Sequence, residues 1–382
     1  MLSFKRALMA AALFITLFYV LTRSHAPAAP SLPVDQEEHH QNLDSLPGSS
    51  KQSSSLTGST PQDGGGKAAG KGAAGGAGES PAQKTMQDMS KMSTYEKLAY
   101  QYPYDIEAKF PAYIWQTWKY TPADGRFTFR EEEASWSRYH EGFIHEVITD
   151  DVAENLIKLF YASVPEVLEA YDAMPLPVLK ADFFRYLILL ARGGVYSDID
   201  TIALKSAVEW VPDSVPRDTV GLVIGIEADP DRPDWHEWYS RRIQFCQWTI
   251  QSKSGHPVLR DVVARITAET LRLKRSGSLS GFQGKNVIEF TGPAIWTDTI
   301  FEYFNDPRFF QMSPGKDVID WRNFTGMETA RKVGDVIVLP ITSFSPGVQQ
   351  MGAKEIDDPM AFVMHGFQGT WKPESERHIG ET

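Results

Sequence analysis

The chain has 382 residues, 42% of them hydrophobic, which is enough for one large domain or two small ones. Its formal net charge of −11 argues against nucleic acid as a partner, because nucleic-acid-binding proteins normally present a basic face. Cys246 is the only cysteine, so an intramolecular disulfide is excluded.

An apolar segment near the N-terminus predicts a membrane anchor. Residues 7–22 follow Lys5 and Arg6, and basic side chains before an apolar run predict a cytosolic tail, here residues 1–6. The run is short for a membrane span, but the membranes of the early secretory pathway are thin. Cleavage as a signal peptide near residues 26–29 is the alternative, which the neighbouring basic residue and prolines disfavour. We therefore expect a signal anchor that places the following chain in the lumen.

The segment after the anchor has the composition of a tether. Proline, serine and glycine dominate residues 23–94, and such a stretch buries too little apolar surface to offset the entropy of ordering it. It predicts a disordered stem that holds a folded domain, residues 95–382, away from the membrane.

The remaining chain alternates predicted strands and helices, which indicates an α/β domain. Strands are expected at residues 111–118, 143–148, 195–203, 220–226, 245–250 and 335–340, with a strand ending near 289. Helices are expected at residues 130–140, 153–160, 164–171, 180–192, 258–274 and from 293 onward, with His256 at the start of one of them.

Residues 180–200, KADFFRYLILLARGGVYSDID, are the centre of this pattern. Apolar side chains recur at helical spacing until Gly193 and Gly194, where a residue without a side chain ends a helix at least cost. The following residues alternate as a strand does, and a period of two puts Asp198 and Asp200 on one face.

Two carboxylates on one face are hard oxygen ligands for a divalent cation. Asp198 and Asp200 supply too few ligands to fill a six-oxygen shell, and a substrate phosphate can complete it. The cation would then offset the charge that develops on a leaving diphosphate. An isolated Asp-x-Asp is most often a solvated turn, so the motif needs its context. Asp182 and Arg185, three residues apart on the helix, are close enough to meet.

Two further segments contain candidate ligand-binding residues. Trp115 could stack on a nucleotide base while Gln116 and Thr117 bond to its sugar, although tryptophans at such positions usually belong to a core. His365 follows an apolar strand and precedes a glycine-spaced loop, which suits a metal ligand, although an isolated histidine is more often structural. Asn323 begins a glycosylation sequon that is usable only in the lumen.

Five motifs occur in one order between residues 111 and 371: IWQTW, KADFFRY through SDID, FCQWTI with SGHP, FTGPAIWTD, and MHGFQGTW. Together they resemble glycosyltransferase family 32, the sugar transferases with an Asp-x-Asp motif, and within it the Golgi α-1,6-mannosyltransferases of fungi that initiate outer chains. The resemblance implies a GT-A-like nucleotide-sugar-binding sheet flanked by helices. It also implies Mn2+ and GDP-mannose, and transfer with retention to an N-linked oligomannose acceptor on a glycoprotein.

The resemblance also implies roles for single residues. Asp200 is expected to bind the metal and Asp198 to contact the metal or the donor ribose, while Asp182 and Arg185 hold the donor sugar. His365 is the expected second metal ligand, Trp371 the diphosphate contact, and Trp115 the base-stacking residue. No residue is identified as a nucleophile. A single-pass type II protein of the Golgi membrane is implied, and a complex with other Golgi mannosyltransferases is compatible with it.

Two alternatives stay open at this point. An inositol phosphoceramide mannosyltransferase shares the central motif, but its relatives carry apolar segments near the C-terminus, and no such run follows Trp371. A non-catalytic sugar-binding protein on the same fold is the other alternative, which the presence of both Asp198 and Asp200 disfavours.

Overall fold

The computed structural model describes residues 88–230, 232–282, 285–310, 318–347 and 351–369, which belong to one compact unit. The predicted cytosolic tail, the predicted anchor and nearly all of the predicted stem lie outside these residues. Within them, no helix is both long enough and apolar enough to cross a membrane. Regular structure begins a few residues before the predicted end of the stem, with a 3-10 turn at Met89–Lys91. A capping box of Ser93 and Glu96 then starts helix α2 (Thr94–Gln101).

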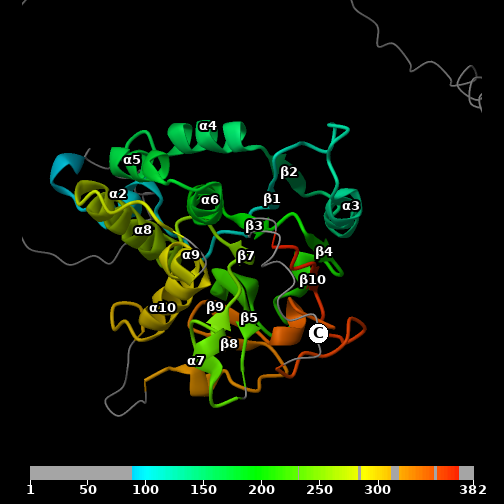
Figure 1. Ribbon diagram of the computed structural model, residues 1–382. Helices are drawn as coiled ribbons and strands as arrows, with labels where there is room; N and C mark the ends of the chain where they lie inside the picture. The colour runs from blue at the N-terminus through cyan, green and yellow to red at the C-terminus, as the bar shows by residue number, and fades with distance from the viewer. Residues whose placement is uncertain (1–87, 231, 283–284, 311–317, 348–350, 370–382) are drawn as a thin grey trace, which may run out of the picture. The chain divides into compact units, whose positions relative to one another are not determined.

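An eight-stranded mixed sheet forms the centre of the molecule (Figure 1). Its strands follow the order β2-β1-β3-β7-β5-β9-β8, with β6 paired to β5. A second, two-stranded sheet joins β10 to β4. The strands are β1 (Tyr113–Thr117), β2 (Ile144–Ile148), β3 (Gly194–Ser197), β4 (Thr201–Ala203), β5 (Leu222–Ala228), β6 (Gln244–Phe245), β7 (Thr249–Ser252), β8 (Arg331–Val333), β9 (Val336–Leu339) and β10 (Val363–His365).

The pairing gives most strands of the main sheet one direction. Strand β1 is parallel to both β2 and β3, and β5 is parallel to β9. Strand β7 is antiparallel to β3 on one side and to β5 on the other, so β3 and β5 also run the same way. The carboxyl ends of β1, β3 and β5 therefore lie at one edge of the sheet, where α/β folds place their ligands.

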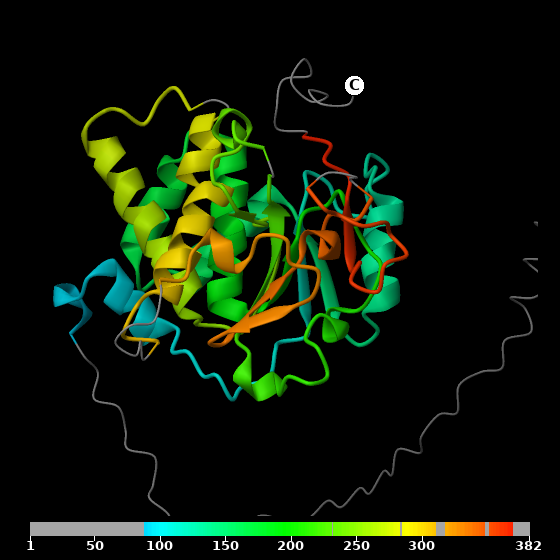
Figure 2. The ribbon, with the colours of Figure 1, turned by 90° about the horizontal axis from the view of Figure 1, so that it is seen from below.

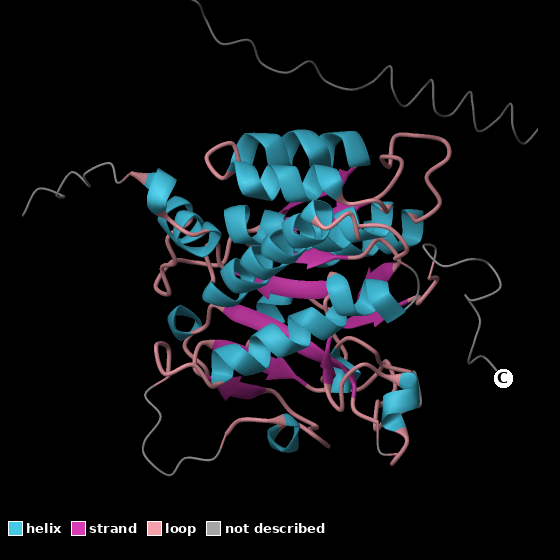
Figure 3. Cartoon of the chain, turned by 60° about the vertical axis from the view of Figure 1, so that its left-hand side comes forward, coloured by secondary structure: helices cyan, strands magenta, loops and turns pink. Residues whose placement is uncertain are grey.

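Helices cover one face of the sheet, and α3 with the small sheet covers the other (Figures 2 and 3). The larger core cluster joins side chains of α5, α6, α8 and α10 to β5, β7 and β9. The smaller cluster contains Trp136, Trp210 and Phe344 against the opposite face. The helices are α3 (Arg130–Tyr139), α4 (Asp150–Phe160), α5 (Pro165–Ala173), α6 (Pro177–Arg192), α7 (Trp235–Trp238), α8 (Pro257–Arg275), α9 (Lys285–Phe290) and α10 (Pro293–Phe304).

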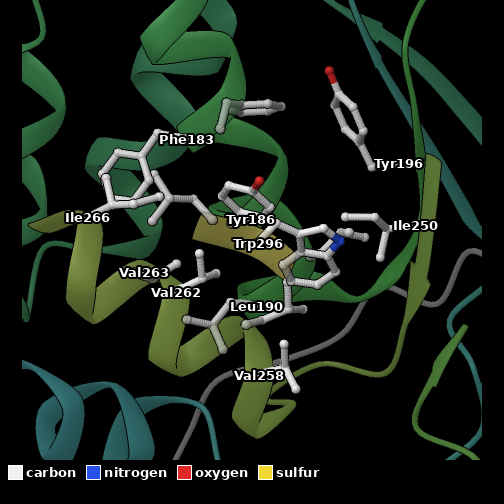
Figure 4. Close-up of a cluster of buried hydrophobic side chains, with 14 of the residues drawn as sticks. Phe183, Tyr186, Leu190, Tyr196, Ile250, Val258, Val262, Val263, Ile266 and Trp296 are labelled. Atoms are coloured by element: carbon white, nitrogen blue, oxygen red, sulfur yellow. The ribbon is translucent and has the colours of Figure 1, made fainter. Parts of the chain in front are cut away.

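Helix α6 is buried along most of its length, as its apolar sequence predicts. Phe183, Tyr186 and Leu190 point toward α8 and the ring of Trp296 (Figure 4). Tyr186 stacks on Trp296 with ring centroids 5.3 Å apart. Burying an aromatic or leucine side chain stabilises the fold by about 1.5–3 kcal/mol, so this packing holds α6 rigidly beneath the sheet edge.

The double glycine joins α6 to β3 without a loop. Gly193 has φ +65° and ψ −165°, a conformation that residues with a side chain rarely adopt. A Cβ at Gly194 would lie 2.6 Å from the carbonyl oxygen of Tyr113, because β3 packs directly against β1. The prediction that the helix ends at these glycines is confirmed.

Three secondary-structure predictions are wrong. Residues 195–203 are not one strand: β3 ends at Ser197, and β4 belongs to the small sheet. Residues 245–250 divide into β6 and β7, because the segment between them leaves the ladder to bond with β5 and α10. The strand expected to end near residue 289 is helix α9, which leads directly into α10.

Candidate active site

The two aspartates of the Asp-x-Asp motif lie in a turn between β3 and β4. The turn forms because Asp198 stops pairing as a strand residue: its carbonyl oxygen accepts hydrogen bonds from Thr201 Oγ1 at 2.6 Å and Gln116 Nε2 at 3.1 Å. Its N–H still donates to the carbonyl oxygen of Trp248 at 2.8 Å. Asp198 and Asp200 therefore do not share the face of one strand, which was the expectation. The turn nevertheless brings both carboxylates to the same edge of the sheet.

A histidine from the C-terminal region joins these two carboxylates. Strand β10 pairs antiparallel with β4, with His365 opposite Thr201. The N–H of Gly366 donates to the carbonyl oxygen of Asp200 at 2.8 Å, and a Cβ at this glycine would be only 3.0 Å from that oxygen. As a result, ligand atoms of Asp198, Asp200 and His365 all lie within 4.8 Å of one another.

The imidazole of His365 is held in place but incompletely bonded. Its ring lies between Trp248 and Phe367, with centroids 4.1 Å from each. Nε2 lies 3.3 Å from Asp200 Oδ1, whereas Nδ1 is buried and has no hydrogen-bond partner. Two carboxylates and an imidazole are the donor set that a divalent metal accepts, and a buried nitrogen without a partner is compatible with that use. The residues fit a divalent cation.

The two aspartates differ in their protonation behaviour. Burial raises the pKa of Asp198, and the neighbouring charge of Asp200 raises it further, while Arg185 opposes both effects. Burial also acts to raise the pKa of Asp200, but His365 and the N–H of Gln368 hold it below its ordinary value. A divalent cation would favour the ionised form of both carboxylates.

Arg185 connects the motif to helix α6. Its Nη2 lies 3.2 Å from Asp182 Oδ1 and 3.1 Å from Asp198 Oδ1, and its side chain is 5% exposed. Tyr196 donates a further hydrogen bond to Asp198 Oδ1 at 3.0 Å. Arg185 Nε is buried without a hydrogen-bond partner, so the guanidinium does not use all of its donors within the described residues.

Asp182 contacts Arg185 from the preceding turn of helix α6. Its two oxygens accept hydrogen bonds from Gln247 Nε2 at 3.2 Å and from Thr291 Oγ1 at 2.8 Å, and its side chain is 4% exposed. Burial raises the pKa of Asp182, and Arg185, Thr291 and Gln247 oppose that rise. Thr291 precedes α10, so the FTGPAIWTD motif reaches the site through this bond. Direct contact between Asp182 and a donor sugar stays a prediction.

The residues expected to bind the nucleotide have clear structural contacts. Trp115 is 7% exposed, stacks on Tyr113 with centroids 5.0 Å apart, and donates from Nε1 to the carbonyl oxygen of Gly193. Gln116 is buried between His145 and the Asp198 carbonyl, and Thr117 lies 3.2 Å from the hydroxyl of Tyr196. These contacts give all three residues a positioning role, and their contact with a nucleotide stays a prediction. Trp371 lies outside the described residues.

One acidic residue at this edge was missed by the sequence reasoning. Glu227 is the penultimate residue of β5 and is partly exposed. Burial raises its pKa, and the charges of His365, Arg185 and Asp198 act on it. No local pattern distinguishes it from a solvated residue at a strand end; only the irregular register between β5 and β6 marks it.

The comparisons with known proteins agree with this geometry. Residues 128–217 match the family described as glycosyltransferase sugar-binding region containing DXD motif. The chain is 50% identical over 301 residues to the initiation-specific alpha-1,6-mannosyltransferase of Candida albicans, covering 74% of this chain and 78% of that protein. It is 46% identical over 282 residues to the protein of the same name from Schizosaccharomyces pombe, covering 72% and 67%.

The chain belongs to the family of initiation-specific α-1,6-mannosyltransferases. The resemblance to family 32 glycosyltransferases is thereby confirmed, and the chain is a glycosyltransferase with a DXD motif. Its likeness to inositol phosphoceramide mannosyltransferase 2 of Schizosaccharomyces pombe is limited to 94 residues at 33% identity, which cover 25% of this chain and 26% of that protein.

Proposed function

We propose that this glycosyltransferase transfers mannose from GDP-mannose to an N-linked oligomannose core, forming an α-1,6 linkage with retention at the anomeric carbon. The names and extent of its relatives support the reaction. The single structural observation that carries it is the convergence of Asp198, Asp200 and His365, because a transferase that releases a nucleoside diphosphate must stabilise that leaving group.

The donor site is proposed at the carboxyl edge of the sheet, in a GT-A-like arrangement. Asp198, Asp200 and His365 would hold Mn2+, which supplies Lewis-acid stabilisation of the diphosphate when bound. Arg185 offers a rigid cation beside them, and it is kept charged by the carboxylates of Asp182 and Asp198. The aromatic rings around His365 limit the freedom of the imidazole, which favours one ligand geometry.

We further propose that the protein is a single-pass type II protein of the Golgi membrane, with residues 7–22 as its anchor. The basic residues before that apolar run support the orientation. Asn323, which is exposed and begins the sequon, would then lie in the lumen. A complex with other Golgi mannosyltransferases is part of the same proposal.

A donor and acceptor screen of the purified full-length protein tests the reaction. With Mn2+ present we expect turnover of GDP-mannose on an oligomannose glycan, and linkage analysis should find a new α-1,6-mannose. Mannosylation of inositol phosphoceramide instead would establish the lipid alternative. The absence of turnover with every donor would support a non-catalytic sugar-binding protein and contradict the proposal.

A further inference from the structure

Glu227 lies at the catalytic edge on a different strand from the metal-site residues. It follows Ile226 near the carboxyl end of β5, where the register with β6 is irregular: Ile226 pairs with Phe245 and Ala228 with Gln244. Such bulges redirect side chains and occur next to active sites. Strands β3 and β5 flank β7, so Glu227 and Asp198 are separated by about two strand spacings, on the order of 10 Å.

The carboxylate of Glu227 has one neutral partner. Oε2 accepts a hydrogen bond from Gln244 Nε2 at 3.1 Å. Oε1 receives no hydrogen bond from a described residue, and the residue is partly exposed. Among the described residues no cation forms an ion pair with Glu227. A partly buried carboxylate is normally paired, and this one keeps an accessible oxygen for a ligand.

The charges around Glu227 determine which ligand suits it. Arg185, His365 and Asp198 act on it from the metal side, and Tyr239 lies near it in the loop after α7. A negative carboxylate repels a diphosphate, so Glu227 is not expected to contact the phosphate end of the donor. Hydroxyl groups are the donors that an unpaired carboxylate accepts. The attacking hydroxyl of a sugar acceptor is the group of that kind that must approach the donor.

We propose that Glu227 is a catalytic residue on the acceptor side, which binds the attacking hydroxyl of the acceptor sugar and takes its proton. In that step the acceptor O–H bond breaks and its proton passes to the Glu227 carboxylate. The bond from the anomeric carbon of mannose to the diphosphate breaks with its electron pair leaving on the diphosphate, and the acceptor oxygen bonds to that carbon on the same face, so that the configuration is retained. Gln244 is then a positioning residue that fixes the orientation of the carboxylate. The inference rests on the proposed transfer reaction.

The substitution Glu227→Gln tests this role in the full-length protein. The amide keeps the size of the side chain and an oxygen for Gln244, so the fold should persist, but it cannot accept a proton. We expect the kcat of transfer to fall about 100-fold or more, as is typical for loss of a general base. The affinity for GDP in the presence of Mn2+, measured by calorimetry, should stay within twofold of the wild-type value. Glu131→Gln, an exposed residue of α3, is the matched control and should leave both quantities unchanged.

Two outcomes would overturn the inference. A Glu227→Gln variant with near-normal transfer would show that the carboxylate has no part in the reaction. Loss of GDP affinity together with activity would place Glu227 in the donor site instead. Both outcomes require an active wild-type protein, so they differ from failure of the proposed function, in which the wild type itself transfers no mannose. If Glu227→Gln unfolds, as judged by its melting curve, Glu227→Ala also removes the carboxylate and provides the same comparison.

Discussion

Two partly buried carboxylate clusters lie at opposite edges of the main sheet. Asp198 follows the carboxyl end of β3, whereas Asp335 immediately precedes the amino end of β9, which runs in the same direction. Asp335 accepts hydrogen bonds from the hydroxyls of Tyr104 at 2.5 Å and Tyr303 at 2.8 Å, and His256 Nε2 lies 3.3 Å away. Both of its oxygens are therefore occupied by the protein.

The cluster around Asp198 is less complete. Asp198 receives Arg185 and Tyr196 on the same oxygen, Oδ1. Arg185 Nε and His365 Nδ1 are buried without hydrogen-bond partners, as is His256 Nε2 in the other cluster. The difference therefore lies in the carboxylates: both oxygens of Asp335 accept hydrogen bonds, whereas Asp198 Oδ2 accepts none from a described residue and stays available for a cation. We infer that the first cluster serves stability and the second serves binding, and this difference can be tested by substitution.

The largest effect is expected from Asp200→Asn. The amide retains the shape of the side chain and can still accept from the N–H of Gln368, but the ligand charge is lost. Turnover of GDP-mannose should fall about 100- to 1000-fold, or roughly 3–4 kcal/mol in the barrier, which is typical when one stabilising group at a developing charge is removed. A chelator should lower the turnover rate of the wild-type protein by a similar factor.

The melting temperature of Asp200→Asn should fall only slightly, because the ion pair with His365 is lost but the side chain contributes little packing. Asp213→Asn, an exposed aspartate outside both clusters, is the control for both measurements. Near-normal turnover in Asp200→Asn, or a wild-type rate insensitive to chelator, would contradict the assignment of the metal site.

A smaller effect is expected from Asp335→Asn, and it concerns stability instead of turnover. In the variant, the side-chain amide nitrogen would face a tyrosine hydroxyl that donates a hydrogen bond to the wild-type carboxylate. Because two donors cannot bond to each other in this arrangement, at least one hydrogen bond of the cluster is lost. The free energy of unfolding, measured with urea, should decrease by about 1–3 kcal/mol. The kcat of the folded fraction should be unchanged, since this cluster is at the far edge of the sheet. A loss of kcat with unchanged stability would mean that the two clusters are coupled.

The sequence predicted much of the catalytic edge, for reasons that are local. Helix α6 and its glycine end follow from spacing and from a backbone conformation that only glycine readily adopts. His256 starts helix α8 as predicted, accepting from the N–H of Val258 at 3.2 Å. The Asp-x-Asp pair was recognised, but its turn was not, because the bonds of the Asp198 carbonyl come from distant Gln116 as well as nearby Thr201.

The parts that escaped prediction depend on contacts between distant segments. The position of His365 beside Asp200 requires β10 to pair with β4; the residues alone left its role open, and the family resemblance predicted it as a metal ligand. The role proposed for Glu227 requires the irregular pairing of β5 with β6. The Asp335 cluster joins an N-terminal tyrosine to a late strand, and a single aspartate before a strand carries no sign of it.

The smallest expected effect is a change in how stability depends on pH. Burial acts to raise the pKa of Asp335, but His256 and the hydroxyls of Tyr104 and Tyr303 hold it well below its ordinary value. A carboxyl with a lowered pKa in the folded state adds stability above its unfolded pKa of about 3.9, and this contribution is lost as the pH falls toward the folded pKa. The difference in unfolding free energy between wild type and Asp335→Asn should therefore be largest near pH 7 and shrink below about pH 4. Urea unfolding at pH 7, 5, 4 and 3 measures it, with Asp213→Asn as control. A difference that stays constant over this range would show that Asp335 contributes through packing alone, and the comparison of the two clusters would lose its electrostatic basis.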